Sequence, residues 1–147
     1  MKAFLLDVNV LIALIDPAHQ HHSPVHRWFL AHRAQGWATC PLTENGFVRI
    51  VSERAYPNLR ITPAEAADLL AALKKGSAKT HQFWSDDVSI TDPARFDLRA
   101  LLSGKQVTDA YLVALCVHHR GSLATLDQHI PWRAVPGAKS SILAMIT

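Results

Sequence analysis

VTDAYLVALCVHHRGSLATLD, residues 107–127, is the stretch that decides the fold class. Thr108 is a good helix cap, and the apolar side chains that follow predict a buried helix over residues 109–119. Gly121 ends this helix, and residues 122–126 form a short apolar run that is typical of a strand buried on both faces. A buried helix joined by a short turn to a fully buried strand indicates an α/β protein with a parallel sheet.

The rest of the chain continues this alternation. Further strands are expected at residues 2–6, 37–40, 81–84 and 141–146. Helices are expected from Val10 (capped by Asn9) to about Pro17, from Ser23 to Gly36, from about Thr43, from Thr62 to Gly76 and from Asp92 to about Leu102. The sequence therefore predicts an α/β sandwich around a mostly parallel central sheet, with no information on strand order.

Composition favours one domain over residues 1–147 in the cytoplasm. The chain has 49% hydrophobic and 18% charged residues, which suits one core and no long disordered arm. The apolar run at the N-terminus is too short for a signal peptide or a membrane span, and Cys40 and Cys116 are expected to be buried thiols. A net charge of +3 permits contact with a polyanion without demanding it.

Four acidic residues stand where folding alone favours apolar side chains. Asp7 and Asp127 each follow a predicted strand, and ligands of parallel α/β sheets bind at the carboxyl ends of strands. Glu44 and Asp109 each lie in the first turn of a predicted helix, on its apolar face. A favourable interaction with the helix dipole explains the first-turn position, but it does not explain the inward face.

Like charges gathered in one place repel each other unless a cation offsets them. Mg²⁺ and Mn²⁺ prefer oxygen ligands, and such a site activates water for attack on a phosphodiester. The residues therefore predict a metal-dependent phosphodiesterase, while leaving the nucleic acid open.

Four segments together resemble a PIN domain, in particular the VapC-type toxin ribonucleases of bacterial toxin–antitoxin pairs. The similarity spans nearly the whole chain in the expected order. The matching segments are FLLDVNVLI at residues 4–12, LTENGF at 42–47, VTDAYL at 107–112 and LATLD at 123–127. Residues 58–92 match no motif of the family.

This resemblance implies a three-layer α/β/α fold, dependence on Mg²⁺ or Mn²⁺, and endonucleolytic cleavage of RNA. It also implies that Asp7, Glu44, Asp109 and Asp127 are the catalytic and metal-binding acids. Asn9 and Thr125 match supporting polar positions that hold a carboxylate or a water in place. The implied partners are an RNA substrate, a small VapB-type antitoxin and a second copy of the chain.

Two other functions remain as alternatives. A haloacid-dehalogenase-type phosphatase would use Asp7 as nucleophile, although such enzymes place a second Asp where this chain has Asn9. A non-catalytic RNA- or protein-binding module on the same fold is the other alternative.

The nine histidines also suggest zinc, but their spacing does not match the usual zinc sites. His118 and His119 are instead expected to close a helix, where a cation suits the dipole.

Overall fold

The protein is described from a computed structural model, which covers residues 2–147. The strands are β1 (Phe4–Leu6), β2 (Trp37–Thr39), β3 (His81–Phe83), β4 (Ser122–Thr125) and β5 (Leu143–Met145). The α-helices are α1 (Val8–Ile15), α2 (His22–His32), α3 (Pro41–Val51), α4 (Pro63–Gly76) and α5 (Val107–His119). The alternation that the sequence predicts is therefore confirmed.

The strands form one five-stranded sheet in the order β3-β2-β1-β4-β5. Each neighbouring pair is parallel, with Leu5 opposite Ala38 on one side and Leu123 on the other. The sequence predicts a mostly parallel sheet, and the observed sheet is parallel throughout. Because parallel strands point the same way, all five carboxyl ends lie at one edge of the sheet. At this edge β1 leads into α1, β2 leads into α3, and β4 leads into the loop that follows it.

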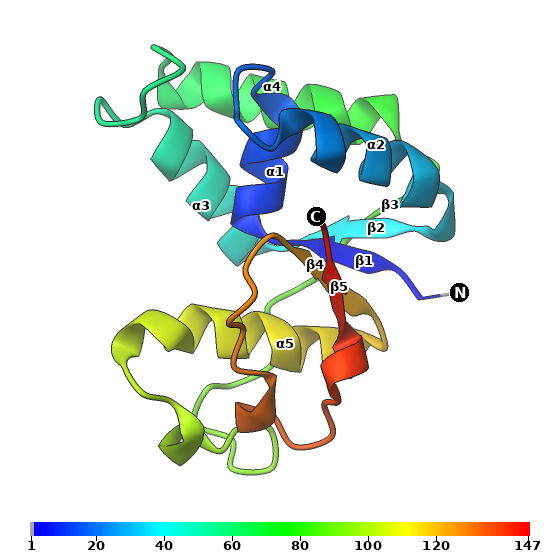
Figure 1. The fold of residues 1–147 in the computed structure, drawn as a ribbon, viewed down its shortest axis with the longest axis vertical. Helices are drawn as coiled ribbons and strands as arrows, with labels where there is room; N and C mark the ends of the chain where they lie inside the picture. Colours follow the sequence, from blue (N-terminus) through cyan, green and yellow to red (C-terminus); the bar gives the residue numbers. More distant parts are fainter. Residues whose placement is uncertain (1) are drawn as a thin grey trace.

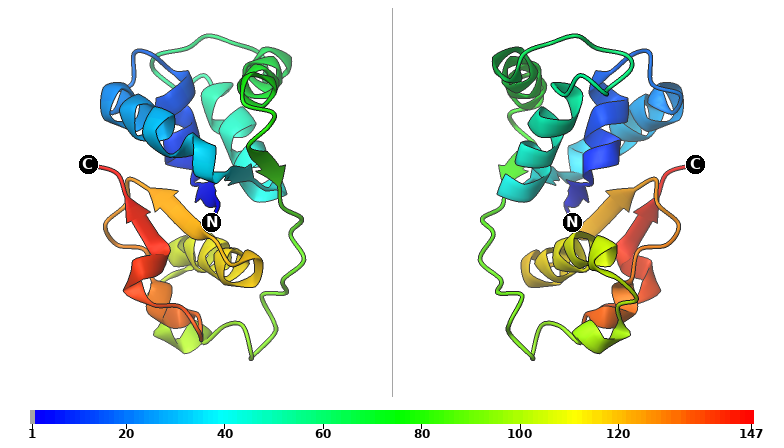
Figure 2. Two further views of the ribbon diagram at one scale, coloured as in Figure 1. Left: turned by 90° about the vertical axis from the view of Figure 1, so that its right-hand side faces the viewer. Right: turned by 90° about the vertical axis from the view of Figure 1, so that its left-hand side faces the viewer.

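Helices cover both faces of the sheet and make three layers (Figures 1 and 2). Helices α1 to α4 lie over one face and α5 lies over the other. Successive residues of β1 serve the two layers, since Leu5 belongs to the core cluster around α5 and Leu6 to the cluster around α1–α4. Both side chains are fully buried. The predicted α/β sandwich is confirmed.

Helix starts differ from the predictions at four places. Helix α2 begins at His22, so Ser23 lies inside its first turn rather than at the predicted start. Asp7, not Asn9, is the N-cap of α1, because its side chain accepts from the backbone N–H of Val8. Helix α3 begins at Pro41 rather than near Thr43, since proline suits the first position of a helix. Helix α5 begins at Val107, so Thr108 lies inside its first turn instead of capping it.

The helix predicted over residues 92–102 is wrong. This segment contains turns and a short 3₁₀ helix at Leu98–Ala100. Phe96 is its one buried hydrophobic residue, so the segment lacks the apolar stripe that holds a helix against a core. Figure 2 shows that the chain after β3 runs from the edge of the sheet to the α5 side as a long connecting segment, without an α-helix or a β-strand.

Two further expectations concern thiols and membranes. Cys40 and Cys116 are buried free cysteines, as predicted. Within residues 2–147, no helix combines the length and the apolar character needed to cross a membrane.

Candidate active site

The site lies at the carboxyl ends of β1, the central strand of the sheet, and of its neighbour β4. These strands are neighbours, and Leu6 pairs with Ala124 at their ends. Asp7 follows β1 directly, and Asp127 follows β4 by two residues. Asp109 comes from the first turn of α5, on the other side of the sheet from α1. The topology thus brings acids from both helical layers to one edge.

Asp7 is the most buried of these acids, with 7% of its surface exposed. Its Oδ1 accepts a hydrogen bond of 2.8 Å from the N–H of Val8, and its Oδ2 accepts one of 2.8 Å from the hydroxyl of Thr125. Burial raises the pKa of Asp7 above its ordinary value, and the charge of Asp127 adds to this, although both hydrogen bonds act to lower the pKa. Two hydrogen bonds therefore orient a carboxyl whose negative charge is disfavoured.

The negative charge of Asp109 is also disfavoured, and more strongly than that of a free aspartate. Burial, followed by the charges of Asp7 and Asp127, raises the pKa of Asp109 to about 6. The three aspartates therefore lie within electrostatic reach of one another. Asp127 is held by the loop after β4, because its Oδ1 accepts from the N–H of His129 at 2.8 Å. Its own N–H donates to the Thr125 hydroxyl at 3.0 Å, so Thr125 links Asp7 to Asp127.

This arrangement fits a divalent cation. The charge of Asp127 raises the pKa of Asp7, and the charges of Asp7 and Asp127 raise the pKa of Asp109. The three carboxylates together supply the hard oxygen ligands that Mg²⁺ and Mn²⁺ prefer. Asn9 supplies a second observation, since its side-chain Oδ1 is buried and has no hydrogen-bond partner among the described residues. A buried carbonyl oxygen without a partner is costly unless a ligand satisfies it. Asn9 lies in the first turn of α1, two residues from Asp7.

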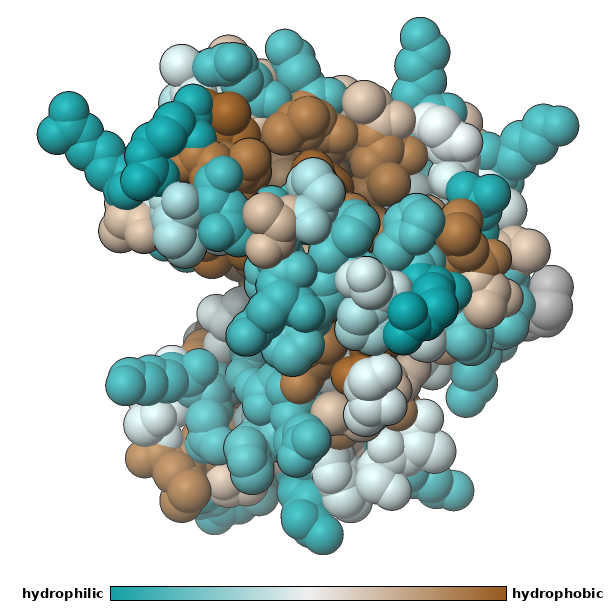
Figure 3. Space-filling view, turned by 45° about the horizontal axis from the view of Figure 1, so that its top comes forward, coloured by the Kyte–Doolittle hydropathy of each residue, from teal (hydrophilic) through white to brown (hydrophobic). Residues whose placement is uncertain are grey.

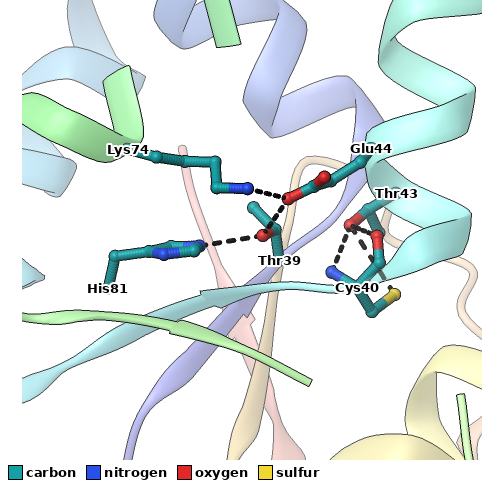
Figure 4. A network of polar contacts seen from close by, with 6 residues as sticks. All are labelled: Thr39, Cys40, Thr43, Glu44, Lys74 and His81. Atoms are coloured by element: carbon teal, nitrogen blue, oxygen red, sulfur yellow. Dashed lines mark hydrogen bonds and ion pairs between the residues drawn. The ribbon is translucent and has the colours of Figure 1, made fainter. Parts of the chain in front are cut away.

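Glu44 occupies the first turn of α3 but is not among the groups that shift the pKa of Asp7 or Asp109. Its Oε2 accepts hydrogen bonds from Lys74 at 2.8 Å and from the hydroxyl of Thr39 at 2.6 Å (Figure 4). The structure therefore gathers Asp7, Asp109 and Asp127, while it turns Glu44 toward α4.

The network around Glu44 contains residues that the sequence analysis missed. The single hydroxyl proton of Thr39 goes to Glu44, so His81 must donate to Thr39 through its Nε2–H, at 2.8 Å. Burial and the charge of Lys74 lower the pKa of His81, with Glu44 acting in the opposite direction. Thr39 at the end of a predicted strand was the one available signal. Nothing in the sequence indicates that Lys74, at the end of α4, reaches Glu44.

A groove of about 940 Å³ adjoins Glu44 between α3 and α4. Its wall includes the apolar side chains of Val48, Leu70 and Phe83, together with Glu44 and Lys74. The space-filling view shows the molecular surface hollowed between the half that carries α1–α4 and the half that carries α5 (Figure 3). Polar side chains gather around this hollow.

Comparison with known proteins gives consistent matches. The chain is 48% identical to Ribonuclease VapC44 of Mycobacterium tuberculosis over 142 residues, which cover 97% of this chain and 98% of that protein. It is 46% identical to Ribonuclease VapC39 of the same organism over 123 residues, or 84% and 87% of the two chains. Ribonuclease VapC38, also from M. tuberculosis, is 42% identical over 123 residues, 84% of each chain. No protein-family model matches the chain. All three relatives are ribonucleases, which disfavours the phosphatase and the non-catalytic alternatives.

Proposed function

Because this chain belongs to the VapC family of ribonucleases, we propose that it is an endoribonuclease toxin that uses Mg²⁺ or Mn²⁺ at Asp7, Asp109 and Asp127. The observation that supports this proposal is the mutual effect of the three carboxyls. Burial and neighbouring carboxylates raise the pKa values of Asp7 and Asp109, so the protein alone does not compensate their charge. A cation held by these carboxylates would offset their charge, and the buried oxygen of Asn9, which has no hydrogen-bond partner among the described residues, would be available to it.

The chain's own residues then have separate tasks. Asp7, Asp109 and Asp127 would hold the cation, with Asn9 in support. A divalent cation bound there supplies a water of lowered pKa as nucleophile and stabilises negative charge on the phosphate. Thr125 keeps the Asp7 carboxylate in one orientation by its 2.8 Å hydrogen bond, and it ties the Asp127 backbone to the same position. Asp109 has to lose its proton before it can serve as a ligand.

We place Glu44 at the border of this site. Lys74 and Thr39 both hold its Oε2, which leaves Oε1 as the oxygen free to position a water or a metal ligand. Lys74 also places a positive charge next to the groove, where it would attract an RNA phosphate.

Cleavage of a labelled single-stranded RNA by the purified protein tests this proposal. Activity is expected with Mg²⁺ or Mn²⁺ and is expected to disappear with EDTA. Asp7→Asn and Asp109→Asn should each lower the rate by at least about 100-fold, because each removes a charged ligand. Asp68→Asn, at an exposed position of α4, is the matched control and should cleave at the wild-type rate. Equal rates for wild type and both site variants would contradict the proposal.

The proposed partners follow from the family and from the groove. A VapB-type antitoxin would lay an apolar segment against Val48, Leu70 and Phe83 and direct its end toward the acids. A second copy of the chain is the other proposed partner. Light scattering of the protein alone, and of the protein with a candidate antitoxin, tests both. Protection of the α3–α4 groove from hydrogen exchange by the antitoxin is the expected result.

A further inference from the structure

Three metal-ligating side chains converge at the end of α5 that lies away from Asp109. Asp87 comes from the irregular segment after β3, and His118 and His119 come from the last turn of α5. One ligand atom from each side chain lies within 4.8 Å of the other two. The Nε2 of His118 is 3.3 Å from one Asp87 oxygen, and the Nε2 of His119 is 3.6 Å from the other.

These separations suit a shared cation better than hydrogen bonds. Charge-assisted N–H···O bonds are about 2.7–2.9 Å long, which is clearly shorter than either contact. Two ligand atoms at about 2.0–2.1 Å from a tetrahedral zinc ion are separated by roughly 3.3 Å. The Nε2 of His119 is moreover buried and has no hydrogen-bond partner among residues 2–147. A buried ring nitrogen aimed at a carboxylate it does not bond to indicates a missing ligand.

We propose that Asp87, His118 and His119 form a second metal site, selective for Zn²⁺ or a similar first-row cation. Two imidazoles and a carboxylate are a donor set that suits Zn²⁺, whereas Mg²⁺ prefers oxygen ligands alone. The fourth position is open to water. This site is chemically distinct from the acidic site, and the length of α5 separates the two by roughly 15 Å, at about 1.5 Å per residue.

The histidine rings are held in place by their neighbours. His119 stacks on Trp84, with ring centroids 4.4 Å apart and an angle of 11° between planes. Trp84 is itself buried against Gly121, where an added Cβ would lie 2.5 Å from the indole. His118 lies edge-on to His119 at 4.9 Å. The two histidine rings on α5 are therefore held by packing, whereas Asp87 is exposed and lies outside any helix or strand.

Arg95 competes with the metal for His118. Its guanidinium donates to the Nδ1 of His118 at 3.2 Å, which places the ring proton on Nε2. A metal at Nε2 requires the other tautomer, so the single ring proton moves to Nδ1, and the Arg95 hydrogen bond is lost. Arg95→Ala should therefore bind Zn²⁺ more tightly than the wild type.

A cation bound at this site would cross-link the segment after β3 to the last turn of α5. Asp87 lies near the start of the segment that connects β3 to α5, residues 84–106, which contains no α-helix. A cation that joins Asp87 to His118 closes this segment against the last turn of α5. The expected consequence is a more stable fold, with no role in RNA cleavage.

Zinc titration by calorimetry, in buffer that contains Mg²⁺ to fill the acidic site, tests the proposal. The wild type should bind one equivalent, and Asp87→Asn and His118→Gln should each weaken binding by about 100-fold. At a free zinc concentration about 100 times Kd, the melting midpoint of the wild type should rise by about 5–10 °C, and that of the two variants should not. RNA cleavage in Mg²⁺ should be the same in all three proteins.

The control variant changes His21 and His26 to Gln, because both lie in the stretch of residues 19–26, which is also rich in histidine, and both are exposed. It should keep the wild-type affinity for Zn²⁺. The proposal is overturned if zinc binding is lost in this control but kept in Asp87→Asn, or if the wild type binds no zinc. Asp87 is exposed, so its variant is expected to fold, and circular dichroism without metal verifies this.

Discussion

Thr125 and Asp7, 118 residues apart in the chain, are joined by a buried hydrogen bond of 2.8 Å from the threonine hydroxyl to Oδ2. The pairing of β1 with β4 makes this contact possible, because Leu6 and Ala124 are partners just before it. The hydroxyl also accepts the backbone N–H of Asp127. One side chain thus fixes the positions of two of the acids that we propose to bind metal.

Thr125→Val keeps the shape of this residue and removes its hydroxyl. We expect kcat/KM for RNA cleavage to fall about 10–100-fold, as is usual when a hydrogen bond that orients a metal ligand is lost. The loss should be partly recovered at high Mg²⁺, since the Thr125 hydrogen bond also lowers the pKa of Asp7. Steady-state cleavage over a range of Mg²⁺ concentrations measures both effects. Thr125→Ser, the control, should stay within a few-fold of wild type, and a fully active Thr125→Val would refute the orienting role.

Asp109 makes the metal-free protein less stable as the pH rises. Its pKa is about 6 in the folded protein, against 3.8 ordinarily, so between these values the folded protein keeps a proton that the unfolded chain releases. The favourable contribution is fully present below about pH 4 and is lost as the pH passes 6. Because Asp109 is half-buried, solvent screening limits the effect to about 1 kcal/mol.

In EDTA we therefore expect Asp109→Asn to melt about 2–4 °C above the wild type at pH 7, with no such gain at pH 4. Thermal melts at both pH values measure this, with Asp68→Asn as the control. Saturating Mg²⁺ at pH 7 should stabilise the wild type and leave Asp109→Asn nearly unchanged. A wild-type midpoint that does not respond to Mg²⁺ would argue against a shared metal site.

The sequence predicts the fold well wherever burial decides the structure. The strands β2 and β4 are buried along their whole length, and the apolar runs at Trp37 and Ser122 predict them directly. The helix predicted over residues 92–102 fails because its cap signals, Asp92 and Pro93, are local and have no apolar stripe behind them. Capping residues start a helix, but packing against the core maintains it.

The sequence likewise predicts part of the candidate site, namely its three aspartates. Asp7 and Asp127 can be found because strand ends meet at one edge of a parallel sheet, and Asp109 because an acid on an apolar helix face needs an explanation. The partners of Glu44 cannot be found this way. Lys74, which donates to Glu44, comes from α4, and His81, which donates to Thr39, comes from β3. Their positions depend on helix packing and strand order, which one sequence does not reveal.

Glu44 and Lys74 form a half-buried ion pair, with 24% and 30% of the two side chains exposed. We expect Glu44→Gln and Lys74→Met each to lower the free energy of unfolding by about 1–2 kcal/mol, between the values for exposed and buried pairs. The free energy of unfolding of the double variant should fall by less than the sum of the two single losses. Denaturant unfolding of the wild type, the two single variants and the double variant measures this coupling. Additive losses would show that the pair contributes nothing.

The rates of RNA cleavage by Glu44→Gln and by Asp109→Asn distinguish the role of Glu44 from that of the aspartates. Glu44→Gln should lower the cleavage rate by less than about 10-fold, because Lys74 and Thr39 already engage one of its oxygens, and because Asp7 and Asp127, not Glu44, are the acids that raise the pKa of Asp109. Asp109→Asn should lower it at least about 100-fold. If Glu44→Gln is as inactive as Asp109→Asn, Glu44 binds the metal directly when RNA is present.

Gly46 controls how closely α3 approaches the start of α1. A Cβ at Gly46 would lie 2.9 Å from Cγ2 of Val8, and the stiff β-branched side chain of Val8 has little freedom to move aside. Gly46→Ala should therefore lower the free energy of unfolding by about 1–3 kcal/mol and displace the N–H of Val8 that binds Asp7. Gly76→Ala is the matched control, since an added Cβ would meet no other part of residues 2–147 within 4 Å, and it should stabilise α4 by up to about 1 kcal/mol. Thermal melts and cleavage rates of the two variants measure the difference. A Gly46→Ala protein as stable and as active as the control would show that α1 can shift without disturbing Asp7.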